Sequence, residues 1–310
     1  ALGNLFRRRG EYDRAVRVHE HLLSRGDLGR VDRERAQHAL ALDFLKAGLL
    51  DRAEQALQRL EGTPFEAEAR LALLAIYERS SDWSLAAAIA DKMDRAAQGD
   101  FSTRQAHYLC EQAATLLGKG QTEEARSLLQ RAIATAPHAA RARIDLAAMQ
   151  QASGDHAAAF STLRTMGEAT PAALPLAAAR LAQAASSSQQ PQAALDLLTS
   201  SYATSPSLDV LEAIVALTAS GTGDNEQART WYVKHLEREP SLVAAAKWIA
   251  GEKLEHAQFH PQIQRALDHA VKPLTRYRCA ACGFEAKQHF WQCPGCQTWD
   301  SYPARRVEEL

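Results

Sequence analysis

The chain repeats one pattern of small and polar positions along most of its length. A small or polar turn residue is followed five positions later by alanine, most clearly in Gly10–Ala15, Gly48–Ala53 and Ser81–Ala86. With four weaker copies, these alanines stand at positions 15, 53, 86, 125, 159, 194 and 228. The successive steps are 38, 33, 39, 34, 35 and 34 residues, a period that predicts stacked structural repeats.

We expect each unit to contain a helix, a tight turn and a second, antiparallel helix, with the alanine where the paired helices approach most closely. Proline ends the second helix in four units, at Pro137, Pro171, Pro206 and Pro240. Small residues within the first helix complete the pattern: Gly3, Ala41, Ala113, Ala147 and Ala216. These positions resemble the tetratricopeptide repeat over about residues 1–240, although the consensus tryptophan is absent from most units. The resemblance implies an all-α superhelical solenoid of seven repeats.

Two segments depart from the repeated phrase. Residues 241–272 keep helical spacing without the turn, and they predict capping helices that shield the last apolar face. Its apolar positions include Trp248, Ile249, Leu254, Ile263 and Leu267. The polar run at residues 186–192 falls where an inter-helix turn is due, so we interpret it as a turn and not as a domain boundary.

A stack of this kind exposes an inner surface, lined by the first helix of each unit, on which an extended peptide or a partner helix can lie. By position, six polar residues are expected to point toward it: Arg35, His38, Glu68, Glu78, His107 and Arg141. For each of them, an ordinary solvated helix residue is the alternative interpretation.

Composition narrows the class of protein. Aromatic residues are only 6% of the chain, which disfavours a large β core, and the 36 basic and 37 acidic residues give no general affinity for nucleic acid. Five cysteines without a disulfide framework favour a reducing, cytoplasmic setting. The first residue is Ala1 and the opening residues read as the middle of a helix, so the sequence leaves open a preceding segment, including a membrane anchor.

A metal site is predicted near the end of the chain. Aromatic residues become frequent from Arg276 onward, and four cysteines stand there as two C-x-x-C pairs: Cys279, Cys282, Cys293 and Cys296. A gap of two residues lets both thiolates of a pair bind the same ion from one tight turn. Two such turns together give a closed tetrahedral site for a single ion. The alternatives, reduced cysteines packed as small hydrophobic residues or a thioredoxin-like redox pair, do not explain this pattern. Cys110 lies far away and is expected to be buried in a helix.

Neighbouring residues have expected supporting roles. Gly283 and Gly295 permit the backbone angles of the two turns, and Arg276 and Arg278 offset part of the negative charge of four thiolates on a divalent ion. We interpret His289 as a surface residue, because the four cysteines already complete the ligand set. Two motifs, Cys-x-x-Cys-Gly and Cys-Pro-x-Cys, resemble rubredoxin and the zinc ribbons. Spacing alone does not separate zinc from iron, and we favour zinc because the rest of the chain offers no redox chemistry.

The combination of both parts is more specific than either one. A tetratricopeptide solenoid joined to these knuckles, with Phe290-Trp291-Gln292-Cys293-Pro294 at the second knuckle and Trp299 after it, resembles the lipopolysaccharide assembly protein B family. The resemblance implies a non-enzymatic adaptor on the cytoplasmic face of the inner membrane of Gram-negative bacteria, held by an N-terminal membrane helix. It implies work with the protease FtsH to promote degradation of the lipid A deacetylase LpxC, and contact with lipopolysaccharide assembly and export proteins.

The residue patterns alone predict the domains and the metal site, but not the partners that the family resemblance implies. They indicate a repeat domain at residues 1–272 and a rubredoxin-like metal-binding domain with four cysteine ligands at 273–310. We expect the two domains to pack together, because the connection at Val271–Tyr277 is too short to act as a flexible linker. A nucleic-acid-associated ribbon and an electron-transfer module remain as alternatives, although five basic against four acidic residues in 276–310 disfavour the first. An enzyme is disfavoured because no nucleophile elbow, phosphate loop or HExxH pair is found. Self-association stays open.

Overall fold

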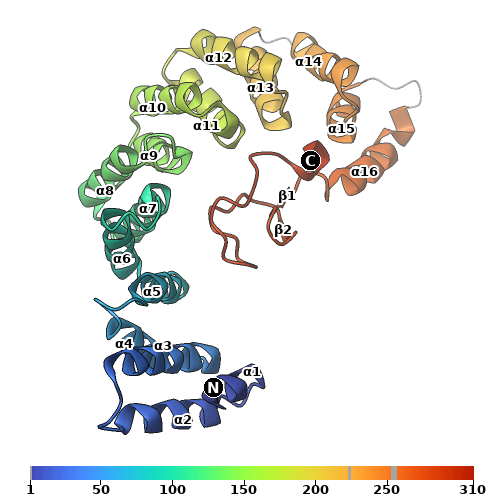
Figure 1. Cartoon of the computed structure of the whole chain (residues 1–310). Helices are drawn as coiled ribbons and strands as arrows, with labels where there is room; N and C mark the ends of the chain where they lie inside the picture. The colour runs from blue at the N-terminus through green and yellow to red at the C-terminus, as the bar shows by residue number, and fades with distance from the viewer. Residues whose placement is uncertain (1, 223–224, 253–256) are drawn as a thin grey trace. The chain divides into compact units, whose positions relative to one another are not determined.

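The computed structural model describes residues 2–222, 225–252 and 257–310 and is almost entirely helical up to residue 271 (Figure 1). Residues up to Gln112 form one compact unit, and residues from Ala113 form a second. The helices of the first unit are α1 (Leu2–Arg8), α2 (Tyr12–Ser24), α3 (Arg30–Ala47), α4 (Leu50–Gln58), α5 (Glu66–Ser80), α6 (Trp83–Arg95) and most of α7 (Ser102–Gly118).

The second unit consists of further helices, followed by two short strands near the end of the chain. Its helices are α8 (Thr122–Thr135), α9 (Ala140–Ala152), α10 (His156–Ala169), α11 (Leu174–Ser187), α12 (Pro191–Thr204), α13 (Leu208–Thr222), α14 (Asn225–Arg238), α15 (Leu242–Ala250) and α16 (His260–Val271). Three short 3-10 turns lie at η1 (Pro171–Ala173), η2 (Ala257–Phe259) and η3 (Val307–Glu309). Two strands, β1 (Tyr277–Arg278) and β2 (Glu285–Ala286), pair antiparallel.

The helix pairs confirm the predicted repeat. All seven repeat alanines are 0–1% exposed, because each lies where its helix meets its neighbours with no room for a larger side chain. The turn residue five positions earlier is left-handed in six units, at Gly10, Gly48, Ser81, Gly120, Gly154 and Gln189. The seventh such residue, Gly223, lies outside the described residues. Four second helices end two residues before the proline that was predicted to stop them, at Thr135, Ala169, Thr204 and Arg238.

The small residues of the first helices are buried in four of the five predicted cases, and Ala216 is the exception. Gly3, Ala41, Ala113 and Ala147 are buried. In α13 the buried face is formed instead by Val210, Leu211, Ala213, Ile214 and Leu217, which leaves Ala216 exposed. The apolar stripe of this helix is therefore rotated by one residue from the repeat pattern, and the prediction for Ala216 was wrong.

A buried charge cluster fixes α1 in the first unit. The carboxylate of Asp43, fully buried in α3, lies 2.8 Å from Nη1 of Arg7 and 2.5 Å from Nδ1 of His19. A side chain at Gly3 would collide with the His19 ring, since an added Cβ would lie 2.4 Å from it. This close approach explains why the small position of the first helix is a glycine.

Beyond the repeats, the two helices predicted for residues 241–272 are present as α15 and α16, and the run at 186–192 is confirmed as the turn between α11 and α12. The expected shielding is incomplete, because no residue of α16 is fully buried and Ile263 is exposed. Leu254 lies outside the described residues. The predicted boundary between residues 272 and 273 falls between α16 and β1, and it stays a prediction.

Candidate metal centre and partner surfaces

Two backbone turns of the same design carry the four cysteines. In the first, the amide of Gly283 donates to the carbonyl of Cys279 at 2.9 Å, and the amide of Cys279 donates to the carbonyl of Phe284 at 2.9 Å. In the second, Gln297 donates to Cys293 at 2.8 Å and Cys293 donates to Thr298 at 3.0 Å. Both turns thus use the same offsets of four and five residues, which places each C-x-x-C pair on the inside of a tight knuckle.

The sulfur atoms of the four cysteines converge. All four Sγ atoms lie within 4.8 Å of one another, with Cys279 and Cys296 at 3.8 Å and Cys282 and Cys293 at 3.7 Å. A tetrahedral ion with metal–sulfur bonds of about 2.3 Å requires sulfur atoms roughly 3.8 Å apart. A disulfide needs about 2.05 Å, so these thiols are not bonded to one another. The four cysteines therefore form a candidate site that fits zinc and iron equally well.

Protonation of the free thiols bears on how such a site is loaded. Burial raises the pKa of Cys279, but hydrogen bonds with Ser301 and with the amides of Cys282 and Ala281 outweigh burial and lower it to about 6. The amide of Phe284 lowers the pKa of Cys282, whereas burial and the neighbouring sulfurs raise it to about 12. Metal ions bind thiolates, so loading of this site is expected to depend on pH and to release protons.

Three sequence-based expectations about the surroundings were wrong. Gly295 does not have a left-handed backbone; that conformation belongs to Gln297, at φ 60°, which occupies the position that Gly283 holds in the first knuckle. Arg278 pairs with Glu285, at 2.8 Å, and Arg276 lies 3.6 Å from the same carboxylate. Their charge is thus directed to a carboxylate instead of to the sulfurs.

His289 is also not a surface residue. Its ring contacts the rings of Tyr277, Trp291 and Tyr302, and Nε2 lies 3.0 Å from the carbonyl oxygen of Tyr302. Burial lowers the pKa of His289, so the neutral ring is favoured. This histidine is a packing residue of the aromatic cluster.

The ribbon (residues 277–302) packs on the last repeats of the second unit, as the short connection predicts. Its buried cluster of Tyr277, Cys279, Cys293 and Tyr302 contacts Leu176 of α11, and Trp291 packs against the hydrophobic core of the repeats. Two of the four cysteines, Cys279 and Cys293, are thus part of the same packed region as a repeat helix. Cys282 and Cys296 remain on the solvent side.

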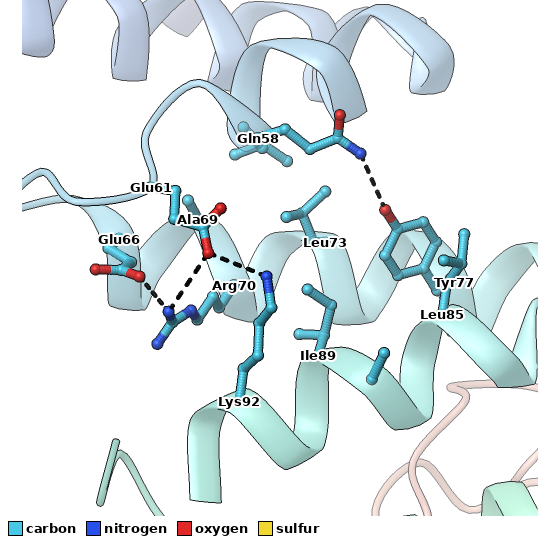
Figure 2. A pocket seen from close by; sticks show the side chains of 12 residues that line it. Gln58, Glu61, Glu66, Ala69, Arg70, Leu73, Tyr77, Leu85, Ile89 and Lys92 are labelled. Carbon is cyan, nitrogen blue, oxygen red and sulfur yellow. Dashed lines mark hydrogen bonds and ion pairs between the residues drawn. The ribbon is translucent and has the colours of Figure 1, made fainter. Parts of the chain in front are cut away.

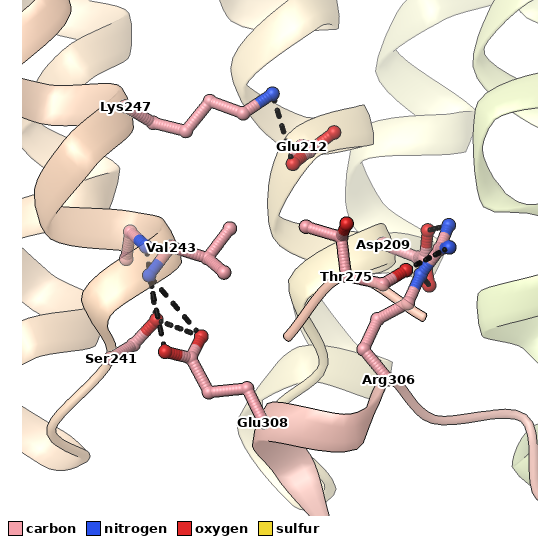
Figure 3. A network of polar contacts seen from close by, with 9 residues as sticks. Asp209, Glu212, Ser241, Val243, Lys247, Thr275, Arg306 and Glu308 are labelled. Atoms are coloured by element: carbon pink, nitrogen blue, oxygen red, sulfur yellow. Dashed lines mark hydrogen bonds and ion pairs between the residues drawn. The ribbon is translucent and has the colours of Figure 1, made fainter. Parts of the chain in front are cut away.

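The tail (residues 303–310) adds polar contacts to the same repeats (Figure 3). The Glu308 carboxylate accepts hydrogen bonds from the amides of Leu242, at 2.6 Å, and Val243, at 3.1 Å, and from the hydroxyl of Ser241, at 2.8 Å. Glu309 accepts from the amide of Leu208 at 2.8 Å. The amides lie in the first turns of α13 and α15, where backbone N–H groups have no intrahelical acceptor. The tail therefore caps the N-termini of these two helices.

Arg306 is the ionic contact of this interface. Its guanidinium forms two hydrogen bonds with the Asp209 carboxylate, at 2.6 and 2.9 Å, and a third with the carbonyl of Thr275, at 2.8 Å. The same group lies 4.2 Å from the centroid of the Tyr277 ring. Burial lowers the pKa of Arg306, but the bonds to Asp209 outweigh it and keep the pKa above its ordinary value. The tail is therefore tied to the ribbon and to α13 at once.

The six groove residues predicted from the repeat pattern differ in exposure. Arg35 and Glu68 are exposed, and His38 is half-buried, 3.1 Å from Glu68 and stacked on Phe65. The other three contradict the prediction of an accessible surface, because His107 and Arg141 are buried and the side chain of Glu78 is only 11% exposed. Glu78 accepts a hydrogen bond from the hydroxyl of Tyr108, which explains its burial.

A cavity of about 340 Å³ between α4, α5 and α6 was not predicted (Figure 2). Leu57, Leu73, Leu85 and Ile89 supply apolar walls. At the rim, Glu61 lies 3.0 Å from Lys92 and 3.9 Å from Arg70, and Arg70 also pairs with Glu66. No motif marks this cavity, because it arises where three helices of two repeats diverge.

The tail contacts were missed as well. Glu309 and Leu208 are 101 residues apart in sequence, and no spacing rule connects them. The one available signal was the pair Glu308-Glu309, since acidic residues favour helix N-termini, but their targets are not readable from the sequence. Cys110, by contrast, is buried in α7 as predicted. None of the helices described here has the length and apolar composition to cross a membrane.

Comparison with known proteins agrees with both parts of the chain. A family model described as "Rubredoxin metal binding domain" matches residues 277–302, and two described as "Tetratricopeptide repeat" match residues 1–33 and 116–185. Among solved structures, the Naa15/Naa10 complex bound to HypK-THB aligns with a TM-score of 0.49 and 14% identity, covering 88% of this chain and 41% of that one.

Curated relatives match along the chain. Lipopolysaccharide assembly protein B of Escherichia coli (strain K12) is 28% identical over 323 aligned residues, covering 100% of this chain and 81% of the relative. The protein of the same name in Haemophilus influenzae (strain ATCC 51907 / DSM 11121 / KW20 / Rd) is 27% identical, covering 97% and 77%. The chain is therefore similar to lipopolysaccharide assembly protein B along its 310 residues, with tetratricopeptide repeats followed by a rubredoxin-like region of four cysteines.

Proposed function

We propose that this chain is a non-enzymatic adaptor that regulates lipopolysaccharide assembly through protein partners. The name of the curated relatives supports the process, and the helical repeats support protein partners, because stacked helix pairs offer extended binding surfaces. The proposed location is the cytoplasmic face of the bacterial inner membrane, where the free thiols would stay reduced.

The finer proposal is that the chain brings the protease FtsH to the deacetylase LpxC and thereby promotes LpxC degradation. The observation that carries it is the seat of the ribbon on α11 together with that of the tail on α13 and α15. Hydrophobic contacts, two capped helices and the Arg306–Asp209 pair join ribbon and repeats into one surface. Such a surface can hold two proteins at a constant separation, whereas a ribbon on a free linker cannot.

We further propose that residues 273–310 form a domain stapled by one metal ion, held by Cys279, Cys282, Cys293 and Cys296, and that the ion is zinc. A closed set of four thiolates suits structural zinc, whose binding supplies on the order of 10 kcal/mol of folding free energy in small domains. Iron in the same sites would instead favour electron transfer, with two ligand cysteines at the solvent side. Metal analysis and the visible spectrum separate the two, because four thiolates give iron a charge-transfer colour and leave zinc colourless.

The adaptor proposal is tested with three variants expressed in a Gram-negative host in place of the native protein. Cys293→Ser/Cys296→Ser removes two ligands, Arg306→Gln loosens the tail with every ligand intact, and Arg305→Gln is the control. Arg305 neighbours Arg306 but makes one exposed hydrogen bond, to Ser205. The half-life of LpxC and the amount of FtsH captured from detergent-solubilised inner membranes are measured for each.

We expect LpxC to be long-lived and FtsH capture to fall in the cysteine variant and in Arg306→Gln, with Arg305→Gln like the parent chain. Normal LpxC turnover in both disruptive variants would contradict the composite surface. Normal FtsH capture combined with slow turnover would place the ribbon in substrate recognition. An iron-loaded, coloured protein whose loss of metal leaves LpxC turnover unchanged would favour the electron-transfer alternative.

A further inference from the structure

A second cavity lies at the seam between the tail, the ribbon and the last repeats. It has a volume of about 310 Å³, and its walls come from four parts of the second unit. Leu208, Asp209 and Glu212 belong to α13, Val243 and Lys247 to α15, Lys272 and Thr275 to the end of α16 and the connection, and Lys287 and Arg306 to the ribbon and tail. The Arg306–Asp209 pair forms one side of it, as Figure 3 shows.

The lining carries more positive than negative charge. Two of its four cations have carboxylate partners within the lining, since Arg306 pairs with Asp209 at 2.6 Å and Lys247 with Glu212 at 3.2 Å. Lys272 and Lys287 are exposed, and neither makes an ion pair within the described parts of the chain. These two ammonium groups give the cavity a surplus of two positive charges, although the whole chain has a net charge of −1.

We propose that this cavity binds a phosphate monoester, with Lys272 and Lys287 as its charge partners. A phosphate monoester carries a charge of about −1.5 to −2 at neutral pH, which matches the surplus. Its terminal oxygens accept several hydrogen bonds, and each ammonium group offers three donors. A single carboxylate would neutralise only one of the two charges. The volume is near the lower end of ligand pockets, at about 300 Å³, and suits a small phosphorylated group.

Such a ligand would also bridge the parts that the seam joins. Lys272 follows α16 and Lys287 follows β2 of the ribbon, and both line the cavity, so an anion held by both would contact both sides of the seam. The ligand binds with full affinity only when the ribbon is seated, and by linkage it must stabilise that seat. The site therefore offers a way for a phosphorylated compound to strengthen the surface on which partners are proposed to meet.

The test uses the whole metal-loaded chain in a phosphate-free buffer of low ionic strength, with sn-glycerol 3-phosphate as the soluble probe and calorimetry as the measurement. Lys272→Gln/Lys287→Gln removes the surplus charge. The matched control is Lys46→Gln/Lys119→Gln, which removes the same charge at two exposed lysines far from the cavity in sequence. A second arm replaces the probe with phosphatidylcholine vesicles that contain phosphatidic acid, and measures co-sedimentation.

We expect saturable binding that weakens at least about tenfold in the cavity variant and stays unchanged in the control, with a raised melting temperature in the presence of probe. Binding of glycerol phosphate alone identifies a soluble ligand, and binding of the vesicles as well identifies a lipid headgroup. The proposal is overturned if no heat is measured at millimolar probe, or if both double variants lose affinity equally. These outcomes do not depend on FtsH or LpxC, so the site and the adaptor function can fail separately.

Discussion

Replacing Arg306 with glutamine is expected to release the tail from the repeats while leaving the metal ligands intact. The guanidinium makes two charge-assisted hydrogen bonds with Asp209, and the two side chains are 24% and 19% exposed. Removing one partner of a fully buried pair costs about 3–5 kcal/mol, because the other charge is left without a counter-charge. Partial exposure lets water screen Asp209 and lowers this to about 2–3 kcal/mol.

The contact with the Tyr277 ring adds roughly 0.5–1 kcal/mol, so the variant should lose about 3 kcal/mol of the free energy that holds the tail in place. That loss corresponds to about a hundredfold faster opening. Hydrogen exchange of four amides reports it directly. Those of Leu208 and Val243 donate to tail carboxylates, and those of Val307 and Glu308 donate to the carbonyls of Arg276 and Leu274.

Arg305→Gln is the matched control, because this neighbouring arginine donates one exposed hydrogen bond to Ser205 and acts on Glu309 only through its charge, without an ion pair to Asp209. It should change the same exchange rates by less than about fivefold. The metal content should be unchanged in both variants. Equal exchange in the two variants would refute the assigned role of the Arg306–Asp209 pair. Loss of metal from Arg306→Gln would show that tail and metal site fold as one step, so that the tail could not be released on its own.

Three further predictions concern the repeats, a knuckle and a histidine. Ala159→Leu should lower the free energy of unfolding in urea by about 1–3 kcal/mol or more, because the site has no free volume, whereas Ala157→Leu on the exposed side of α10 should change it little. Gln297→Gly should slow metal loss to a chelator, since relief of a left-handed backbone stabilises the knuckle by about 0.5–1 kcal/mol. Burial lowers the pKa of His235, so the unfolded chain binds the proton more readily and the free energy of unfolding falls as pH drops below about 6.5. His235→Gln should reduce this dependence of the free energy of unfolding on pH, as measured by urea titrations.

The repeat and the cysteine site were predictable because both depend on local rules. A positive φ at Gly48 and the tight helix contact at Ala53 lie within one unit, so their spacing is written in consecutive residues. Two-residue gaps between cysteines likewise constrain a single turn. The repeat spacing fails where packing against a neighbouring unit decides which face of a helix is buried. Ala216 is exposed because α13 buries Ile214 and Leu217 instead.

The partner-facing surfaces were not predictable to the same extent. Repeat position places a residue on a helix face, but its exposure depends on which side chains cover it. His107 and Arg141 are buried for this reason, although their types and positions suit a polar surface. The cavity at α4–α6 and the seam cavity both combine residues from several elements, and a sequence pattern does not show where helices separate.

The tail gives the metal site a physical connection to the repeats. Glu308 and Glu309 accept hydrogen bonds from amides in the first turns of α15 and α13. Burial raises the pKa of Glu309, whereas hydrogen bonds from the amides of Arg306 and Leu208 lower it. A buried carboxylate is tolerated there because helix amides and a nearby guanidinium surround it. If the knuckles open, the ribbon no longer holds the tail in place. The first turns of α13 and α15 then lose the carboxylate acceptors of the tail together. A metal ion held by the four cysteines would thus contribute to the order of helix ends that lie far from the cysteines in sequence.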